Sequence, residues 1–108
     1  MKKRLFINGE WIGTDEYTSL SSPYSGEVIA EIPIATEKET DQAIEVAYQA
    51  RNEMSKMPAH QRAKILESLS RLLEQKADEA ARILALEAAK PITTAKSEVA
   101  RTIETYKF

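Results

Sequence analysis

The spacing of apolar residues changes near residue 36 of this 108-residue chain. Before that point apolar runs are short, and between residues 28 and 34 apolar side chains recur at every second position, the period of a strand. After it, apolar residues recur every three or four positions, the period of an amphipathic helix. The pattern predicts a hairpin, loop and strand over residues 1–35 and helices over residues 36–108.

The front of the chain has the signals of a β-hairpin. The segments RLFI and EWIG flank Asn8-Gly9, and this pair tolerates the positive φ angles of a tight type I′ turn. Residues 14–26 are rich in Ser and Thr and contain the turn sequence SPYSG, so we expect a connecting loop there. One further strand should follow over residues 28–34, with Pro33 at its edge or end because proline lacks an amide donor.

The helical section divides into about four segments, at its two internal prolines and at one further break. Thr36 followed by Glu39 has the form of a capping box and predicts the first helix start. That helix should stop before Pro58, because the residue preceding a proline disfavours the helical conformation. The same proline suits the opening of the next helix.

The apolar stripe after the first proline is too long for one typical helix. It runs from residue 59 to residue 89, so we expect a break near residues 76–78, with Asp78 capping the segment that follows. Pro91 should end that segment and start the last one, whose stripe continues to Tyr106.

Four amphipathic segments carry more apolar surface than three short strands can bury. The last four residues, TYKF, continue a helical pattern without a glycine or polar cap. We therefore expect polypeptide outside these 108 residues to complete the core, and we expect the 108-residue chain alone to self-associate.

Composition limits the classes of partner. The chain has 15 basic and 17 acidic residues, a net charge of −2 and 43% hydrophobic residues, which describes a soluble globular chain. Basic and acidic residues are interleaved, so we expect no nucleic-acid partner.

No apolar run could span a membrane. The basic start resembles that of a signal peptide, but only three apolar residues follow it before NGE. A cytoplasmic location is expected.

Residues that could carry chemistry are few. The chain has no cysteine and one histidine, His60, which we interpret as a solvated residue at a helix start. A general base needs a reacting partner and a metal needs several ligands, neither of which one histidine supplies. The three glycines form no Gly-X-Gly-X-X-Gly run. We assign no catalytic, cofactor-binding or metal-binding residue.

The carboxylates have a structural interpretation. Glu74 with Asp78 and Glu98 with Glu104 are conceivable acid/base pairs, but neither lies in an apolar setting. We interpret them as parts of a solvated helix face. Surface ion pairs are expected at helical spacing, and they are Glu67 with Arg71, Glu87 with Lys90, and Glu98 with Arg101.

Six segments in order resemble the amino-terminal region of the aldehyde dehydrogenase superfamily. They are LFINGEW (5–11), SPYSGEVIA (22–30), the first helix (36–50), QRAKIL (61–66), EAAKPI (87–92) and AKSEV (95–99).

Two positions depart from the family pattern: Ala89 stands where the family usually has glycine, and Lys96 where it often has arginine. The first departure puts a left-handed cap in doubt, because alanine there costs about 1 kcal/mol, so we expect this helix to close differently.

The resemblance implies an α/β parent enzyme several times longer than this chain, with the chain contributing a mostly helical portion. It implies a cysteine that attacks an aldehyde to form a thiohemiacetal, hydride transfer to NAD or NADP, and a glutamate-activated water. The alanine variant and the ending TIETYKF are similar to the branch acting on lactaldehyde, glyceraldehyde-phosphate or phosphonoacetaldehyde. Residues 1–108 would then be the amino-terminal part of the cofactor-binding domain of a homo-oligomeric enzyme. They would lack the catalytic and oligomerisation regions, bind cofactor poorly and be inactive alone, with the remainder of the parent chain as partner.

A second interpretation comes from a different class of protein. The chain could be a free-standing helical interaction module that pairs its apolar stripes with a partner or with itself. The stripe residues Leu69, Leu73, Leu84 and Val99 suit either interpretation. A stop codon directly after Phe108 would favour the module.

Overall fold

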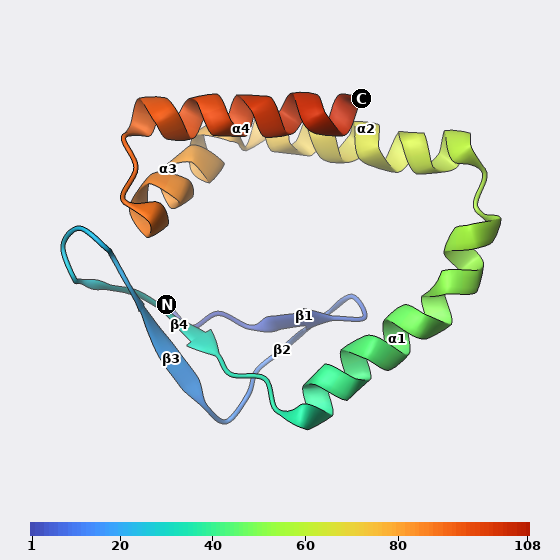
Figure 1. Cartoon of the computed structure of the whole chain (residues 1–108), viewed down its shortest axis with the longest axis horizontal. Helices are drawn as coiled ribbons and strands as arrows, with labels where there is room; N and C mark the ends of the chain where they lie inside the picture. The colour runs from blue at the N-terminus through green and yellow to red at the C-terminus, as the bar shows by residue number, and fades with distance from the viewer. The chain divides into compact units, whose positions relative to one another are not determined.

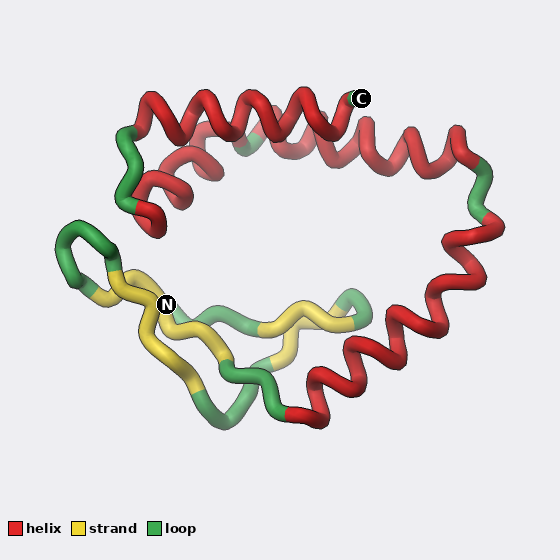
Figure 2. Tube along the Cα trace, in the orientation of Figure 1, coloured by secondary structure: helices red, strands yellow, loops and turns green.

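The computed structural model describes all 108 residues, which form two compact units. One unit contains Met1–Ser21 and Ser25–Lys56, and the other contains Ser22–Tyr24 and Met57–Phe108. Figure 1 labels the elements along the chain, and Figure 2 distinguishes helices from strands. The elements are β1 (Leu5–Ile7), β2 (Glu10–Ile12), β3 (Tyr17–Ser21), β4 (Val28–Pro33), α1 (Glu37–Lys56), α2 (Ala59–Gln75), α3 (Ala77–Ala88) and α4 (Ile92–Lys107).

The predicted hairpin is confirmed as the antiparallel pair β1–β2. Asn8 and Gly9 have φ angles of 53° and 78°, the two positive values that a type I′ turn requires. Phe6 lies opposite Trp11 in the register, and their ring centroids are 4.8 Å apart. Such a cross-strand aromatic pair stabilises a short hairpin beyond its backbone bonds.

A second antiparallel pair, β3–β4, differs from the expected loop. Residues 14–26 were predicted to connect elements, but Tyr17–Ser21 is a strand that pairs with β4. Thr18, Ser19 and Ser21 are exposed, while Tyr17 and Leu20 are half-buried. A strand with so few apolar positions gives a weak two-residue pattern, so the sequence predicted one strand here and the structure has two.

The far edge of β4 is also occupied. The Lys3 N–H donates to the Glu31 carbonyl (2.9 Å), and the Glu31 N–H donates to the Met1 carbonyl (3.0 Å). Pro33 is the last residue of β4 and lies opposite Tyr17, which agrees with the end position predicted for it. The start of the chain therefore protects an edge that would otherwise have unpaired backbone groups.

Helix α1 begins at the predicted capping signal and ends before Pro58. The Thr36 N–H donates to Glu39 Oε2 at 2.8 Å, and the Thr36 hydroxyl donates to the same carboxylate oxygen. The helix spans Glu37–Lys56 and contains no buried residue. Its start is therefore fixed by polar contacts and not by packing.

The predicted break between α2 and α3 is confirmed at Lys76, which has a non-helical φ of −108°. The prediction that Asp78 caps the second segment was wrong. The cap position is Lys76, and no side chain makes a capping hydrogen bond there. Asp78 lies inside the first turn of α3, where a carboxylate still favours the positive end of the helix dipole.

Helix α3 closes in the left-handed conformation, contrary to expectation. Ala89 has φ 51° and ψ 39°, and the N–H of the next residue, Lys90, donates to the Ala85 carbonyl at 3.2 Å. This closure satisfies a terminal carbonyl even though alanine at positive φ costs about 1 kcal/mol relative to glycine. Pro91 then starts α4 as predicted.

Helices α2, α3 and α4 pack around one hydrophobic cluster. Its buried members are mostly small residues of α3 and α4, and partly buried residues of α2 and α3 surround them. Small side chains let helix backbones approach closely. The buried members are Ala81, Ala95, Val99 and Ile103, and Leu73, Ala77, Ala80, Leu84 and Ala85 pack against them.

Candidate functional site

Side chains that could do chemistry are dispersed over the surface. His60 lies exposed in the first turn of α2. No group of three or more His, Cys, Asp or Glu side chains converges in a way that could hold a metal ion. None of the helices has the length and apolar character that crossing a membrane requires. The site with the most distinct geometry is therefore an apolar surface and not a catalytic cluster.

The ion pairs differ from those expected at helical spacing. The four observed pairs include none of the three predicted ones. Glu98 Oε1 lies 2.5 Å from Lys90 Nζ, so each of these residues has a partner eight positions away instead of three. Long side chains reach across the α3–α4 connection, which spacing along one helix cannot indicate. The other pairs are Lys76–Glu79 (3.6 Å), Asp78–Lys96 (3.7 Å) and Glu104–Lys107 (3.0 Å).

Two ionisable groups have shifted pKa values. The hydrogen bond from the Thr36 hydroxyl, followed by the one from its backbone N–H, lowers the pKa of Glu39. The hydrogen bond and the charge of Glu104 raise the pKa of Lys107. Both shifts favour the charged form and have local partners at helix ends, so they indicate structural contacts rather than a group prepared for proton transfer.

Buried Ser70 joins α2 to α4. Its hydroxyl donates to the Ile103 carbonyl at 3.0 Å, and only 2% of the residue is exposed. The apolar pattern of the sequence did not indicate a role for Ser70. In the sequence, Ser70 is a polar residue between Leu69 and Leu73. Periodicity alone does not show which side of α2 packs against α3 and α4, so it does not show that Ser70 is buried.

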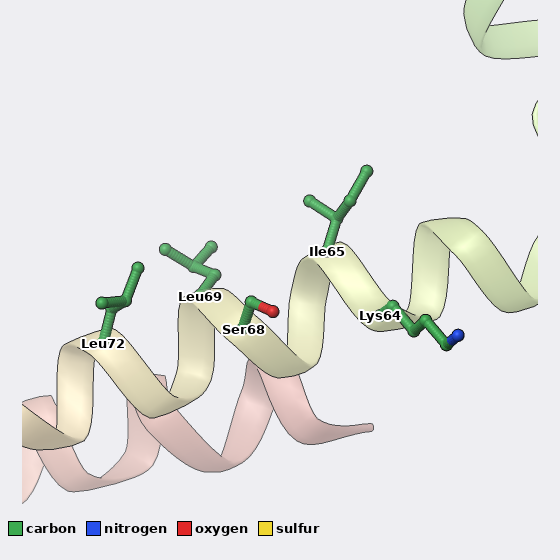
Figure 3. A pocket seen from close by; sticks show the side chains of 5 residues that line it. All are labelled: Lys64, Ile65, Ser68, Leu69 and Leu72. Carbon is green, nitrogen blue, oxygen red and sulfur yellow. The ribbon is translucent and has the colours of Figure 1, made fainter.

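An apolar hollow lies along the outer side of α2. It has a volume of about 430 Å³ and is lined by Ile65, Leu69 and Leu72 together with Lys64 and Ser68. Figure 3 shows the three aliphatic side chains projecting to the same side of the helix. We call Ile65, Leu69 and Leu72 the outer stripe.

The outer stripe is distinct from the side of α2 that packs against α3 and α4. That inner side contains Ser70 and Leu73, which follow Leu69 and Leu72 by one residue and are therefore rotated by about 100°. Sequence periodicity merged both sides into one apolar stripe, and only the packing separates them. More than half of Ile65 and Leu72 is exposed, 53% and 57% respectively.

The chain matches one protein family over nearly its whole length. The model of the aldehyde dehydrogenase family matches residues 11–108. Malonate-semialdehyde dehydrogenase of Listeria monocytogenes is 39% identical over 109 residues, which covers 99% of this chain and 22% of the relative. Lactaldehyde dehydrogenase of Methanocaldococcus jannaschii is 38% identical over 104 residues, covering 96% of this chain and 22% of the relative. The chain therefore spans about a fifth of the length of these relatives.

Solved structures contain the same fold. Aldehyde dehydrogenase 21 from Physcomitrella patens, in complex with succinate, matches with a TM-score of 0.93 and 34% identity over 98% of this chain and 22% of that chain. The NADP-dependent glyceraldehyde-3-phosphate dehydrogenase of Bacillus halodurans, complexed with NADP, matches with a TM-score of 0.95 and 31% identity over 99% of this chain and 23% of that chain. The motif order, the fold and the family match agree: the chain belongs to the aldehyde dehydrogenase family and corresponds to its amino-terminal region.

Proposed function

We propose that residues 1–108 are the amino-terminal part of the cofactor-binding domain of an NAD(P)-dependent aldehyde dehydrogenase. The observation that carries this proposal is the family match over residues 11–108 in a chain that spans about a fifth of its relatives. Solved relatives that share the fold are complexed with NADP. The role of this part is to provide helices and hairpins that support the domain.

The residues present do not fit a dinucleotide site of their own. Gly9 and Gly26 lie in turns of the β section and have positive φ angles, and Gly13 directly follows β2. None of them opens a helix, where a phosphate would meet backbone N–H groups. Cofactor binding is therefore assigned to residues outside this chain.

The chemical step also requires a residue type that this chain lacks. The family resemblance implies a cysteine nucleophile, and this chain has none. We therefore propose that the isolated 108 residues do not oxidise aldehydes. The test is the absorbance of reduced nicotinamide when the purified chain is mixed with an aldehyde and NAD⁺ or NADP⁺. Sustained turnover above that of a heat-denatured sample would refute the proposal.

The most direct experiment on the parent enzyme is to sequence the source gene beyond the codon for Phe108. We expect several hundred further codons that encode a glycine-rich segment, a cysteine and a glutamate base. A stop codon directly after Phe108 would instead support the helical interaction module, whose apolar faces would then need a separate partner.

The substrate and cofactor preference of the parent need their own assay. Relatives of similar identity are named for malonate semialdehyde and for lactaldehyde, so identity does not separate these substrates. We propose to compare kcat/KM for both aldehydes, with NAD⁺ and with NADP⁺, on the complete enzyme. A preference of tenfold or more for one aldehyde would assign the substrate, because it corresponds to about 1.4 kcal/mol of differential transition-state binding.

We also propose that both the complete enzyme and the isolated chain associate with copies of themselves. We expect the complete enzyme to be a homo-oligomer, and we expect the isolated chain to self-associate because large apolar residues such as Ile44 and Leu86 are exposed. Sedimentation velocity at several concentrations tests both expectations. A monomeric 108-residue chain at high concentration would contradict the second.

A further inference from the structure

Helix α2 is apolar on two sides, and its own unit covers only one of them. The inner side, with Ser70 and Leu73, packs against α4 and α3. The outer stripe of Ile65, Leu69 and Leu72 lines an open hollow (Figure 3). At 100° per residue the large apolar residues of α2 span an arc of roughly 120°, and its own unit covers only part of that arc. The outer stripe therefore requires a second apolar surface.

The side chains around the outer stripe define the chemistry of that surface. The hollow is lined by three aliphatic residues together with Lys64 and Ser68, and no acidic residue lines it. The nearby acidic residues, Glu67 and Glu74, lie about 160–180° around the helix from Ile65. An uncharged aliphatic or aromatic surface fits the three aliphatic side chains, because a charged group placed directly over them would lose hydration without gaining a partner.

Charge also disfavours a second copy of α2 as the occupant. Arg62 and Lys76 lie at the two ends of the outer stripe. Lys64 lines the hollow, and Arg71 lines a second, smaller hollow beside Leu72. An antiparallel pair of outer stripes would bring Arg62 of one helix near Lys76 of the other. Like charges brought together across an interface are unfavourable, so the partner differs from α2 itself.

We propose that the outer stripe is covered, in the complete enzyme, by an uncharged apolar surface of the polypeptide that follows Phe108. This inference rests on the proposed function, because it requires a longer chain. Solved proteins with the same fold devote only 22% and 23% of their length to it. More than three quarters of such a protein is therefore available to form the second layer over α2.

The absence of cysteine from this chain allows a direct test by single substitutions. Ile65→Cys and Leu72→Cys place a thiol on the outer stripe, and Glu67→Cys, an exposed position on the opposite side of α2, is the matched control. Each variant is prepared in the complete enzyme and in the 108-residue chain and reacted with a maleimide. Mass spectrometry resolves the labelled peptide from any native cysteine of the enzyme.

The expected result is a contrast between the two proteins. In the complete enzyme, Ile65→Cys and Leu72→Cys should react at least about tenfold more slowly than Glu67→Cys, because labelling would require local opening. In the 108-residue chain at low concentration the three thiols should react at similar rates. Both substitutions remove side chains that are more than half exposed here, so the short chain should tolerate them.

Three results would overturn the inference. Equal labelling rates in the complete enzyme would mean that nothing covers the outer stripe. Slow labelling of Ile65→Cys in the monomeric short chain would place the cover within these 108 residues. Protection of the short chain that rises with its concentration would identify a second copy as the occupant.

Aldehyde oxidation by the same enzyme preparations separates the two proposals. An active enzyme with a reactive outer stripe refutes only this inference. An inactive enzyme with a protected outer stripe refutes only the dehydrogenase function.

Discussion

The unit that contains α2, α3 and α4 buries a cluster of aliphatic side chains, whereas the unit that contains the strands and α1 buries only Ile7, Ala30 and Pro33 among its apolar residues. In the first case helices meet through fully buried alanines, Ala81 and Ala95. In the second case strands are joined by backbone hydrogen bonds, and α1 has no buried residue at all. The helical unit should therefore depend on side-chain packing, and the β unit on backbone pairing and polar caps.

The largest expected effect tests this dependence on packing. Ile103→Ala removes a side chain that is 6% exposed in the helical cluster, and such truncations typically lower the free energy of unfolding by about 2–5 kcal/mol. Ile44→Ala, the same change on α1 at a residue that is 63% exposed, should stay within about 0.5 kcal/mol. Urea unfolding followed by circular dichroism measures both. Similar losses in the two variants would contradict the comparison.

A smaller effect is expected from the hydrogen bond between α2 and α4. Ser70→Ala removes the hydroxyl that donates to the Ile103 carbonyl, and the unfolding free energy should fall by about 0.5–1.5 kcal/mol. Ser68→Ala, an exposed serine on the same helix, is the control and should change it by less than about 0.5 kcal/mol. Hydrogen exchange of the last turn of α4 locates the loss. If Ser68→Ala costs as much as Ser70→Ala, the buried bond contributes nothing specific.

The left-handed closure of α3 predicts a change in the opposite direction. Ala89→Gly should raise the unfolding free energy by about 0.5–1 kcal/mol, because glycine adopts φ 51° without the steric cost of a Cβ atom. Ala88→Gly, one residue earlier and inside the helix, should lower it by about 0.5–1 kcal/mol. Thermal and urea unfolding of the pair give the two signs. A loss of stability in Ala89→Gly would mean that the helix closes differently in solution.

The sequence predicted most helix boundaries because prolines and the capping pair act locally. Pro58, Pro91 and the Thr36–Glu39 pair set helix ends through backbone geometry within a few residues. Strand β3 was missed because its polar residues form a strand only through pairing with β4, a non-local contact. The outer stripe lay within the predicted apolar stripe of residues 59–89 but was not separated from the inner side, for a similar reason: a helical period indicates apolar faces but not which of them finds a partner.

The smallest predicted effect concerns the polar cap of the β unit. Thr36 donates two hydrogen bonds to the Glu39 carboxylate, and these lower the pKa of Glu39 in the folded chain. A depressed carboxyl pKa stabilises the fold above the pKa of the unfolded chain, about 4.3 for glutamate, and that contribution disappears as the pH falls through the folded value. We therefore expect the start of α1 to loosen below about pH 4.

Thr36→Val, which removes the hydroxyl donor but keeps the backbone N–H, should raise the Glu39 pKa toward its ordinary value. An NMR titration of the Glu39 side-chain carboxyl carbon measures it. An unchanged pKa in Thr36→Val would show that the backbone bond alone holds the carboxylate, so that the cap of α1 would depend on the backbone as the strands of its unit do.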